Sequence, residues 1–263
     1  PRTAPRRALA TGLQRLRRQV RPPATLIAAA MAVVAGITLV AARDGGAQVL
    51  SVRPTMSTDP VVVPVTTDAV VARPECRHIV HLGDSNLGIT LDMFEERYDR
   101  LGLDARVDFA NGRGAHSARD GGTSALEAIA DATAAVTPDG RCWVIALSGT
   151  DAAEAWRDGV DPSGSIRAII DALGDDPVLW VTPVLVSTRR ESNLEASTAY
   201  NRDLGVIAAE HPNITILDWQ DIALDHLDQF QDDGIHYQRP LYVLLVDTVI
   251  TAEERTWVLQ ATP

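Results

Sequence analysis

The sequence contains no lysine and only two cysteines, and beyond residue 42 it is short of positive charge altogether. Residues 1–42 hold seven arginines and no acidic residue, which leaves 17 arginines against 35 acidic residues in the remainder, a formal charge of −18. Binding to nucleic acid relies on cationic surface that neutralises phosphates. The acidic remainder therefore excludes nucleic acid as an expected partner, and we attribute the missing lysine to coding bias rather than to chemistry.

The two cysteines, Cys76 and Cys142, are poor candidates for a metal site. Neither belongs to a CxxC or HxxxH pair of the kind that binds zinc. The acid-rich segment 225–233 lacks the spacing and the glycine of a calcium-binding loop. We therefore expect no metal and no other cofactor.

A stretch without any charged residue lies between Arg21 and Arg43. About 20 apolar residues in a helix cross a hydrocarbon core ~30 Å thick, so we predict a transmembrane helix at residues 22–43. The preceding arginines place residues 1–21 in the cytoplasm by the positive-inside rule, which makes this a single-pass protein of the cell membrane. A signal peptide cleaved after Ala42 is the alternative, and both interpretations export the rest of the chain.

The remainder divides into a tether and one folded domain. Residues 44–74 contain four prolines among valine, threonine and aspartate, a composition typical of an extended linker. In residues 75–263, short apolar segments alternate with amphipathic ones, which indicates a parallel sheet covered by helices on both faces. We predict an α/β domain, a three-layer flavodoxin-like sandwich with five parallel strands in the order 2-1-3-4-5. The expected strands are 78–82, 106–109, 142–147, 178–181 and 214–217, and the expected helices are 86–101, 124–136, 165–173, 194–210 and 241–252.

This strand order brings the two cysteines together. Cys76 precedes the first strand and Cys142 begins the third, and these strands are neighbours in the predicted sheet. Both thiols then lie at the same edge of the sheet, close enough for a disulfide. Export would favour their oxidation, whereas two buried free thiols are the alternative.

Polar and glycine-rich segments follow four of the five predicted strands. They are residues 83–85, 111–114, 148–151 and 232–236. Each segment alone could be a helix cap or a turn. In open α/β sheets, however, ligands bind outside the carboxyl ends of the strands, and all four segments fall there in order. Their combination indicates an active site.

This arrangement resembles the SGNH (GDSL-like) hydrolases, whose blocks are a GDS serine, a loop glycine, a GxND segment and a terminal DxxH. Here the residues 83–85 read Gly-Asp-Ser, Gly112 is the loop glycine, and residues 233–236 read Asp-Gly-Ile-His. The resemblance covers residues 77–252. Narrower features such as Asp218-Trp219 are similar to the extracytoplasmic SGNH domains associated with integral-membrane acyltransferases of the acyltransferase 3 type.

The resemblance implies a serine nucleophile. Ser85 would attack an acyl carbonyl, His236 would take its proton, and Asp233 would orient the imidazole ring. The backbone amides of Ser85 and Gly112 would bind the oxyanion. The third donor of the family is the asparagine of GxND, but Asp151 occupies that position, and a carboxyl group donates only when it is protonated.

This departure leaves three outcomes open. Asp151 is held protonated by burial and completes the oxyanion hole, or Thr150 replaces it as the donor, or the domain is slow or inactive. We expect the domain to have kept its catalytic activity. Its possible substrate contacts are Asp84, Asn86, Arg113 and Thr150.

The sequence thus predicts a membrane-anchored serine esterase or O-acyltransferase outside the cytoplasm. Its substrate would be acyl, most simply acetyl, esters of cell-envelope glycan or glycolipid. A transferase would depend on an integral-membrane acyltransferase partner that brings acyl groups across the membrane. A non-catalytic glycan-binding or scaffold module is the alternative, while a flavodoxin-type cofactor protein would not require Asp233 and His236 together.

Overall fold

The computed structural model describes the residues of the predicted domain and little else. These are residues 72–147, 149–187 and 192–261. All of them belong to one compact unit, Thr66–Pro263. The basic segment 1–21, the transmembrane helix predicted at 22–43 and all but the last three residues of the 44–74 linker lie outside the described residues. Within the described ranges, no helix combines the length and the apolar character needed to cross a membrane.

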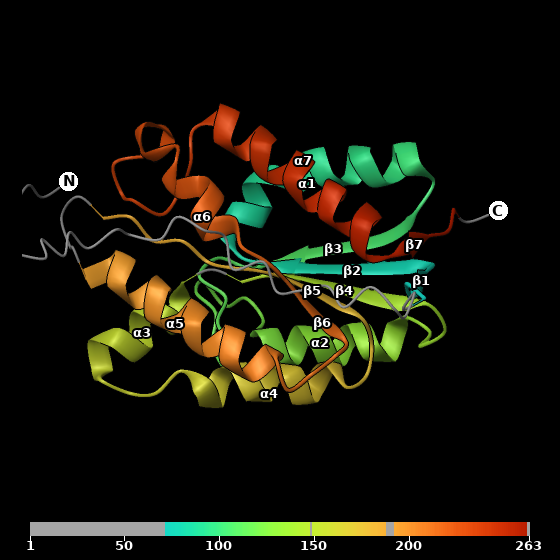
Figure 1. Cartoon of the computed structure of the whole chain (residues 1–263), viewed down its shortest axis with the longest axis horizontal. Helices are drawn as coiled ribbons and strands as arrows, with labels where there is room; N and C mark the ends of the chain where they lie inside the picture. The colour runs from blue at the N-terminus through green and yellow to red at the C-terminus, as the bar shows by residue number, and fades with distance from the viewer. Residues whose placement is uncertain (1–71, 148, 188–191, 262–263) are drawn as a thin grey trace, which may run out of the picture. The chain divides into compact units, whose positions relative to one another are not determined.

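A sheet of five parallel strands forms the middle layer (Figure 1). The strands are β2 (His78–Gly83), β3 (Asp104–Phe109), β4 (Arg141–Ala146), β5 (Val178–Val181) and β6 (Ile214–Leu217), in the order β3-β2-β4-β5-β6. The chain therefore moves outward from β2 to β3 and then returns across β2 to β4. Strands β4 and β5 are almost wholly buried and nearly free of polar residues, as expected for central parallel strands. The predicted α/β class with a five-stranded parallel sheet is confirmed.

Helices cover both faces of this sheet (Figure 1). One face carries α1 (Ser85–Leu101), α6 (Trp219–Leu224) and α7 (Arg239–Thr256), and the other carries α2 (Ala125–Ala135), α3 (Thr150–Asp158), α4 (Ser163–Leu173) and α5 (Ser192–Ala208). Alternate residues of β2 serve the two layers: Ile79 packs into the core under α1 and α7, and Val80 into the core under α2 and α4.

Several short elements are absent from the sequence-based prediction. Helix α3 reads TDAAEAWRD and buries only Asp151, Ala152 and Ala155, so it has no long apolar periodicity to reveal it. The two-residue strands β1 (Glu75–Cys76) and β7 (Val258–Leu259) pair only because tertiary packing brings the two ends of the domain together. Helix α6 and the short 3₁₀ helix η1 (Leu227–Gln229) are likewise shorter than any periodic signal.

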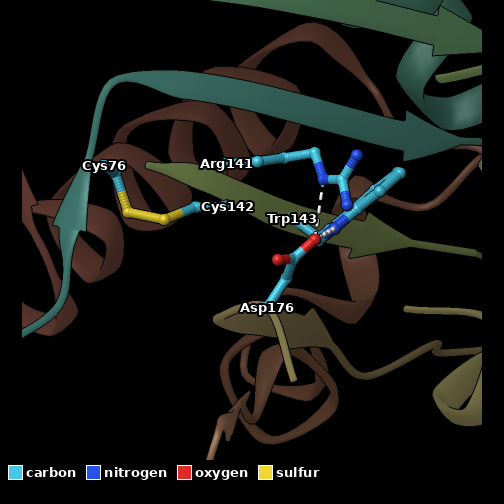
Figure 2. The surroundings of a disulfide bond; sticks show 5 residues. All are labelled: Cys76, Arg141, Cys142, Trp143 and Asp176. Carbon is cyan, nitrogen blue, oxygen red and sulfur yellow. Dashed lines mark hydrogen bonds and ion pairs between the residues drawn. A yellow bond between two sulfur atoms is a disulfide. The ribbon is translucent and has the colours of Figure 1, made fainter. Parts of the chain in front are cut away.

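Cys76 and Cys142 form a disulfide, as predicted (Figure 2). Their Cα atoms are 5.7 Å apart, and the bond ties β1 to the amino end of β4. Beside it, the Asp176 carboxylate accepts hydrogen bonds from Arg141 Nε at 2.6 Å and from Trp143 Nε1 at 2.9 Å. A crosslink that closes a loop of this length contributes about 4 kcal/mol to stability in the chain-entropy estimate. At the amino edge of the sheet, the two cysteines are therefore bonded to each other, and the side chains of Arg141 and Trp143 are bonded to that of Asp176.

Candidate active site

Ser85 is the first residue of α1 and is separated from the end of β2 by one residue, Asp84. Asp84 caps the helix, since its Oδ1 accepts the N–H of Asn86 at 2.9 Å. Gly83 permits the abrupt change from strand to helix, because a Cβ there would lie 2.5 Å from the Cβ of Leu87. Ser85 is thus held at a helix N-terminus, where free N–H groups and the helix dipole favour negative charge.

His236 lies in the loop that precedes α7, and two neighbouring residues fix the conformation of this loop. Gly234 has a φ of 69°, and a Cβ at that position would lie 1.3 Å from the carbonyl oxygen of Val186, so only glycine fits. Asp233 Oδ1 accepts hydrogen bonds from the N–H groups of Ile235 and His236, both at 2.9 Å. The loop therefore presents the Asp233 and His236 side chains together.

The three predicted catalytic side chains are in direct contact. Ser85 Oγ lies 2.9 Å from His236 Nε2, and His236 Nδ1 lies 2.6 Å from Asp233 Oδ2. Partial burial opposes ionisation of Asp233, but hydrogen bonds from the His236 ring and from two backbone N–H groups outweigh it and lower the pKa of Asp233. An ionised Asp233 keeps a proton on Nδ1, which leaves Nε2 free to accept the serine proton. The arrangement can therefore activate Ser85 as a nucleophile.

Ser85 and His236 open into a cleft of about 360 Å³. Gly112 and Thr150 also line it, so each of the four sequence blocks contributes a predicted residue to one cavity. The remaining lining residues are Asn111, Arg119, Asp120, Gly149, Ala153, Leu185 and Ile235.

The cleft contains two backbone N–H groups suited to an oxyanion. Neither the Ser85 nor the Gly112 N–H donates to any other described residue. Gly112 has a φ of 55°, and a Cβ there would lie 2.9 Å from the Arg119 side chain. Both N–H groups are therefore available to stabilise negative charge on a bound acyl oxygen.

Asp151, the third predicted oxyanion residue, is used differently. It lies in the first turn of α3, is 8% exposed and does not line the cleft. Both carboxylate oxygens accept the N–H of Ala115, at 2.9 and 3.1 Å. Burial raises the pKa of Asp151, although the Ala115 N–H opposes that shift. In place of the predicted donor, the structure shows an acceptor that secures the loop following Gly112.

The predicted substrate contact of Arg113 does not fit the structure. Its side chain is fully buried, and Nη2 donates to Asp108 Oδ1 at 2.6 Å and to Thr123 Oγ1 at 3.0 Å. A further bond joins Nη1 to the Asp108 carbonyl at 3.0 Å. The guanidinium group therefore braces the glycine loop from within and has no route to the cleft.

Asp84 and Asn86 also act within the protein, while Thr150 faces the cleft. Asp84 is 1% exposed and caps α1. The Asn86 side chain donates to the Ile235 carbonyl at 3.3 Å and accepts the Tyr242 hydroxyl at 2.9 Å, which connects α1 to the histidine loop. Of the four predicted substrate contacts, Thr150 alone lines the cavity beside Ser85.

Arg119 and Asp120 are cleft residues that the sequence-based prediction missed. Asp120 is the one described non-glycine residue with a left-handed φ, 57°, and it precedes Gly121 and Gly122. The Asp-Gly-Gly run could have indicated a turn. It could not have indicated that the turn folds back onto Gly112.

Several solved structures are similar to this domain. The lipase/acylhydrolase from Enterococcus faecalis is 17% identical with a TM-score of 0.51, covering 71% of this chain and 99% of that chain. The C-terminal catalytic domain of peptidoglycan O-acetyltransferase A from Streptococcus pneumoniae is 20% identical with a TM-score of 0.51, covering 70% and 96%. A member of the lipolytic G-D-S-L family from Veillonella parvula DSM 2008 is 15% identical with a TM-score of 0.53, covering 68% and 98%.

The domain has the SGNH (GDSL) hydrolase fold. At these identities the likeness is one of fold. No protein-family model matches the sequence, and no curated protein matches it. The SGNH fold explains why the sequence blocks converge: each follows a strand of one parallel sheet, and parallel strands end at the same edge.

Proposed function

We propose that this domain is a serine esterase or O-acyltransferase acting on acyl, most simply acetyl, esters of cell-envelope glycan or glycolipid. The observation that carries the proposal is the chain of contacts from Ser85 Oγ through His236 to Asp233. Ser85 and His236 line a cleft together with Gly112, and the N–H groups of Ser85 and Gly112 donate to no other described residue. The similar catalytic domain of a peptidoglycan O-acetyltransferase motivates the choice of a carbohydrate ester.

The reaction would proceed through an acyl-enzyme. Ser85 Oγ attacks the ester carbonyl while its proton moves to His236 Nε2, and the Ser85 and Gly112 N–H groups stabilise the oxyanion. The ester C–O bond then breaks as His236 returns the proton to the leaving sugar oxygen. Water, or a second sugar hydroxyl in a transferase, next loses a proton to His236 and attacks the acyl-enzyme, and Ser85 regains its hydrogen. Thr150 replaces Asp151 as the side-chain donor in this scheme.

The proposal includes a location and partners. Residues 22–43 would anchor the chain, residues 1–21 would remain in the cytoplasm, and the domain would act outside it. The disulfide supports this placement, because disulfides persist in oxidising compartments. A transferase would receive acyl groups from an integral-membrane acyltransferase partner.

One observation favours a second candidate, a catalytically impaired glycan-binding module. Asp151 uses its carboxylate on Ala115 and supplies no donor to the cleft. Loss of one oxyanion donor lowers kcat by about 10²–10³ in other hydrolases. A module that only binds glycan would have no need of the Ser85 hydroxyl.

A single comparison tests the proposal. The full chain, its Ser85→Ala variant and a Ser165→Ala control in α4 are treated with a fluorophosphonate probe and with 4-nitrophenyl acetate. Covalent labelling and turnover that disappear in Ser85→Ala, and persist in Ser165→Ala, are the expected result. A folded wild-type protein that is silent with both reagents yet binds envelope glycan would favour the second candidate.

A further inference from the structure

An arginine without an acidic partner lies on the wall of the serine cleft. Arg119 lines the cleft and is exposed, and no acid of the described residues pairs with it. Nearby, Arg106 and Arg113 both form ion pairs with Asp108. In a chain where acids outnumber arginines beyond residue 42, a free guanidinium group beside the nucleophile is a distinctive feature of the cleft.

The backbone around Arg119 is held in a defined conformation. Its N–H donates to the Asn111 carbonyl at 2.8 Å, and its own carbonyl accepts the Gly122 N–H at 3.0 Å. Between them, Asp120 adopts the left-handed region that non-glycine residues rarely occupy. Such conformations persist only where the surroundings enforce them, and they concentrate at functional sites.

The side chain of Arg119 lies against the predicted oxyanion glycine. A Cβ at Gly112 would be 2.9 Å from both Cγ and Cδ of Arg119 and 3.0 Å from its Nε. The stem of the arginine therefore crosses Gly112, which places the guanidinium group next to the part of the cleft where an ester carbonyl would be bound. Any substituent carried by the sugar near that ester would pass close to it.

We propose that Arg119 binds a carboxylate on the substrate, so that the preferred ester is an O-acylated acidic sugar. This inference rests on the proposed esterase or acyltransferase function of the same cleft. A guanidinium group presents a planar pair of N–H donors that matches a carboxylate, and the resulting charge-assisted bonds are stronger than neutral ones. One arginine suits a singly charged carboxylate, whereas phosphate is usually bound by a cluster of cations, and Arg119 is the one arginine among the described residues that line the cleft.

The acid next to Arg119, Asp120, favours one orientation of a bound anionic sugar. Asp120 also lines the cleft, so an anionic group is attracted at Arg119 and repelled one residue further along. Asp233, which does not line the cleft, is engaged by the His236 ring and by backbone N–H groups. An acidic sugar therefore has one favourable orientation, with its carboxylate at Arg119 and its ester toward Ser85.

The test uses three sugars that differ at one carbon. The full chain is assayed with O-acetylated methyl glucuronoside, methyl glucoside and methyl glucoside 6-phosphate, each carrying the acetyl group at the same position. We expect kcat/KM for the glucuronoside to exceed that for the glucoside by about 10-fold, the effect of one charge-assisted hydrogen bond. This preference should shrink as salt is added.

Variants assign the preference to one residue. Arg119→Gln should bring the ratio of kcat/KM for the glucuronoside to kcat/KM for the glucoside down to about 1, and Arg119→Lys should keep part of the preference because the ammonium group lacks the planar fork. Arg255→Gln removes the same charge near the far end of α7 and should keep the preference. The proposal is overturned if wild type shows no preference, if Arg119→Gln retains it, if the neutral ester falls equally, or if the phosphate is the best substrate.

A binding measurement separates this inference from the proposed function. Unacetylated methyl glucuronoside and methyl glucoside are titrated into Ser85→Ala by NMR, with and without Arg119→Gln. Binding that favours the glucuronoside and depends on Arg119 supports the carboxylate site even if wild type cleaves no ester. Equal binding of both sugars, or none, overturns the site regardless of catalysis.

Discussion

The two edges of the central sheet use their polar groups in opposite ways. At the amino edge, Cys76 is bonded to Cys142, and Asp176 is satisfied by Arg141 and Trp143. At the carboxyl edge, the N–H groups of Ser85 and Gly112 donate to no other described residue, and both residues line a cavity. In this domain the disulfide and the candidate catalytic residues therefore lie at opposite ends of the same strands.

The largest effect is expected from breaking the carboxyl edge. His236→Ala removes the proposed base, whose Nε2 contacts Ser85, and should lower kcat on 4-nitrophenyl acetate by about 10⁴ or more. The side chain is only partly buried, so the midpoint of urea unfolding should shift little. If His236→Ala also unfolded at a much lower urea concentration, the carboxyl edge would contribute to stability as well as to activity, which would contradict the comparison.

Breaking the amino edge should do the reverse. The double variant Cys76→Ser/Cys142→Ser should lower the free energy of unfolding by about 4 kcal/mol. The activity per folded molecule should stay unchanged, because the bond lies at the edge away from the cleft. Urea denaturation of oxidised wild type and of the variant measures the first quantity, and a change in kcat of the folded variant would contradict the second.

A smaller effect is expected at Asp151, which links structure and chemistry at the carboxyl edge. Asp151→Ala frees the Ala115 N–H and loosens the loop after Gly112, so kcat should fall by about 10-fold, as for loss of a hydrogen bond to a charged group. Asp151→Asn is the matched control, since its side-chain carbonyl still accepts from Ala115, and it should stay within about 3-fold of wild type. Equal activity of Asp151→Ala and wild type would show that the loop needs no anchor.

The smallest expected effect is on the pH dependence of stability, and it arises from a buried acid in α7, one of the helices that cover the sheet. Glu253 in α7 is fully buried and accepts the Tyr98 hydroxyl at 2.7 Å, and burial raises its pKa to about 8. Between the ordinary glutamate pKa and about 8 the folded state holds a proton that the unfolded state has lost, so stability falls as pH rises.

Urea titrations at several pH values measure this slope. Over that range the loss in wild type should reach at least about 1 kcal/mol, the equivalent of one pKa unit. Glu253→Gln should flatten the slope, while the activity of the folded protein, which depends on the cleft, should not follow it. A slope that Glu253→Gln leaves unchanged would contradict the assignment to this residue.

The elements that could be predicted from sequence are those with a local signal. Runs such as 142–147 and 178–181 are apolar because central strands are covered on both faces, and the first residues of the active site follow strand ends in order. Helix α3 was not predicted, because its nine residues bury only two alanines and an aspartate, which is too small an apolar face to stand out in the sequence.

The role of Asp151 illustrates what could not be predicted at the site. Its partner, the Ala115 N–H, is 36 residues away, and no pattern indicates which backbone group a carboxylate will meet. The departure from the asparagine of related proteins is visible in the sequence. Its structural consequence, an anchor for the loop after Gly112, is visible only in the fold.

The sequence by itself determined the alternation of strands and helices, the disulfide pair and the order of the blocks around Ser85 and His236, because these depend on local periodicity and on the rules of parallel sheets. Tertiary structure decided how two arginines of one loop are used. Arg113 is buried against Asp108, and Arg119 is free at the cleft. The two are chemically identical and six residues apart, so only the folded loop, which desolvates one and exposes the other, distinguishes them.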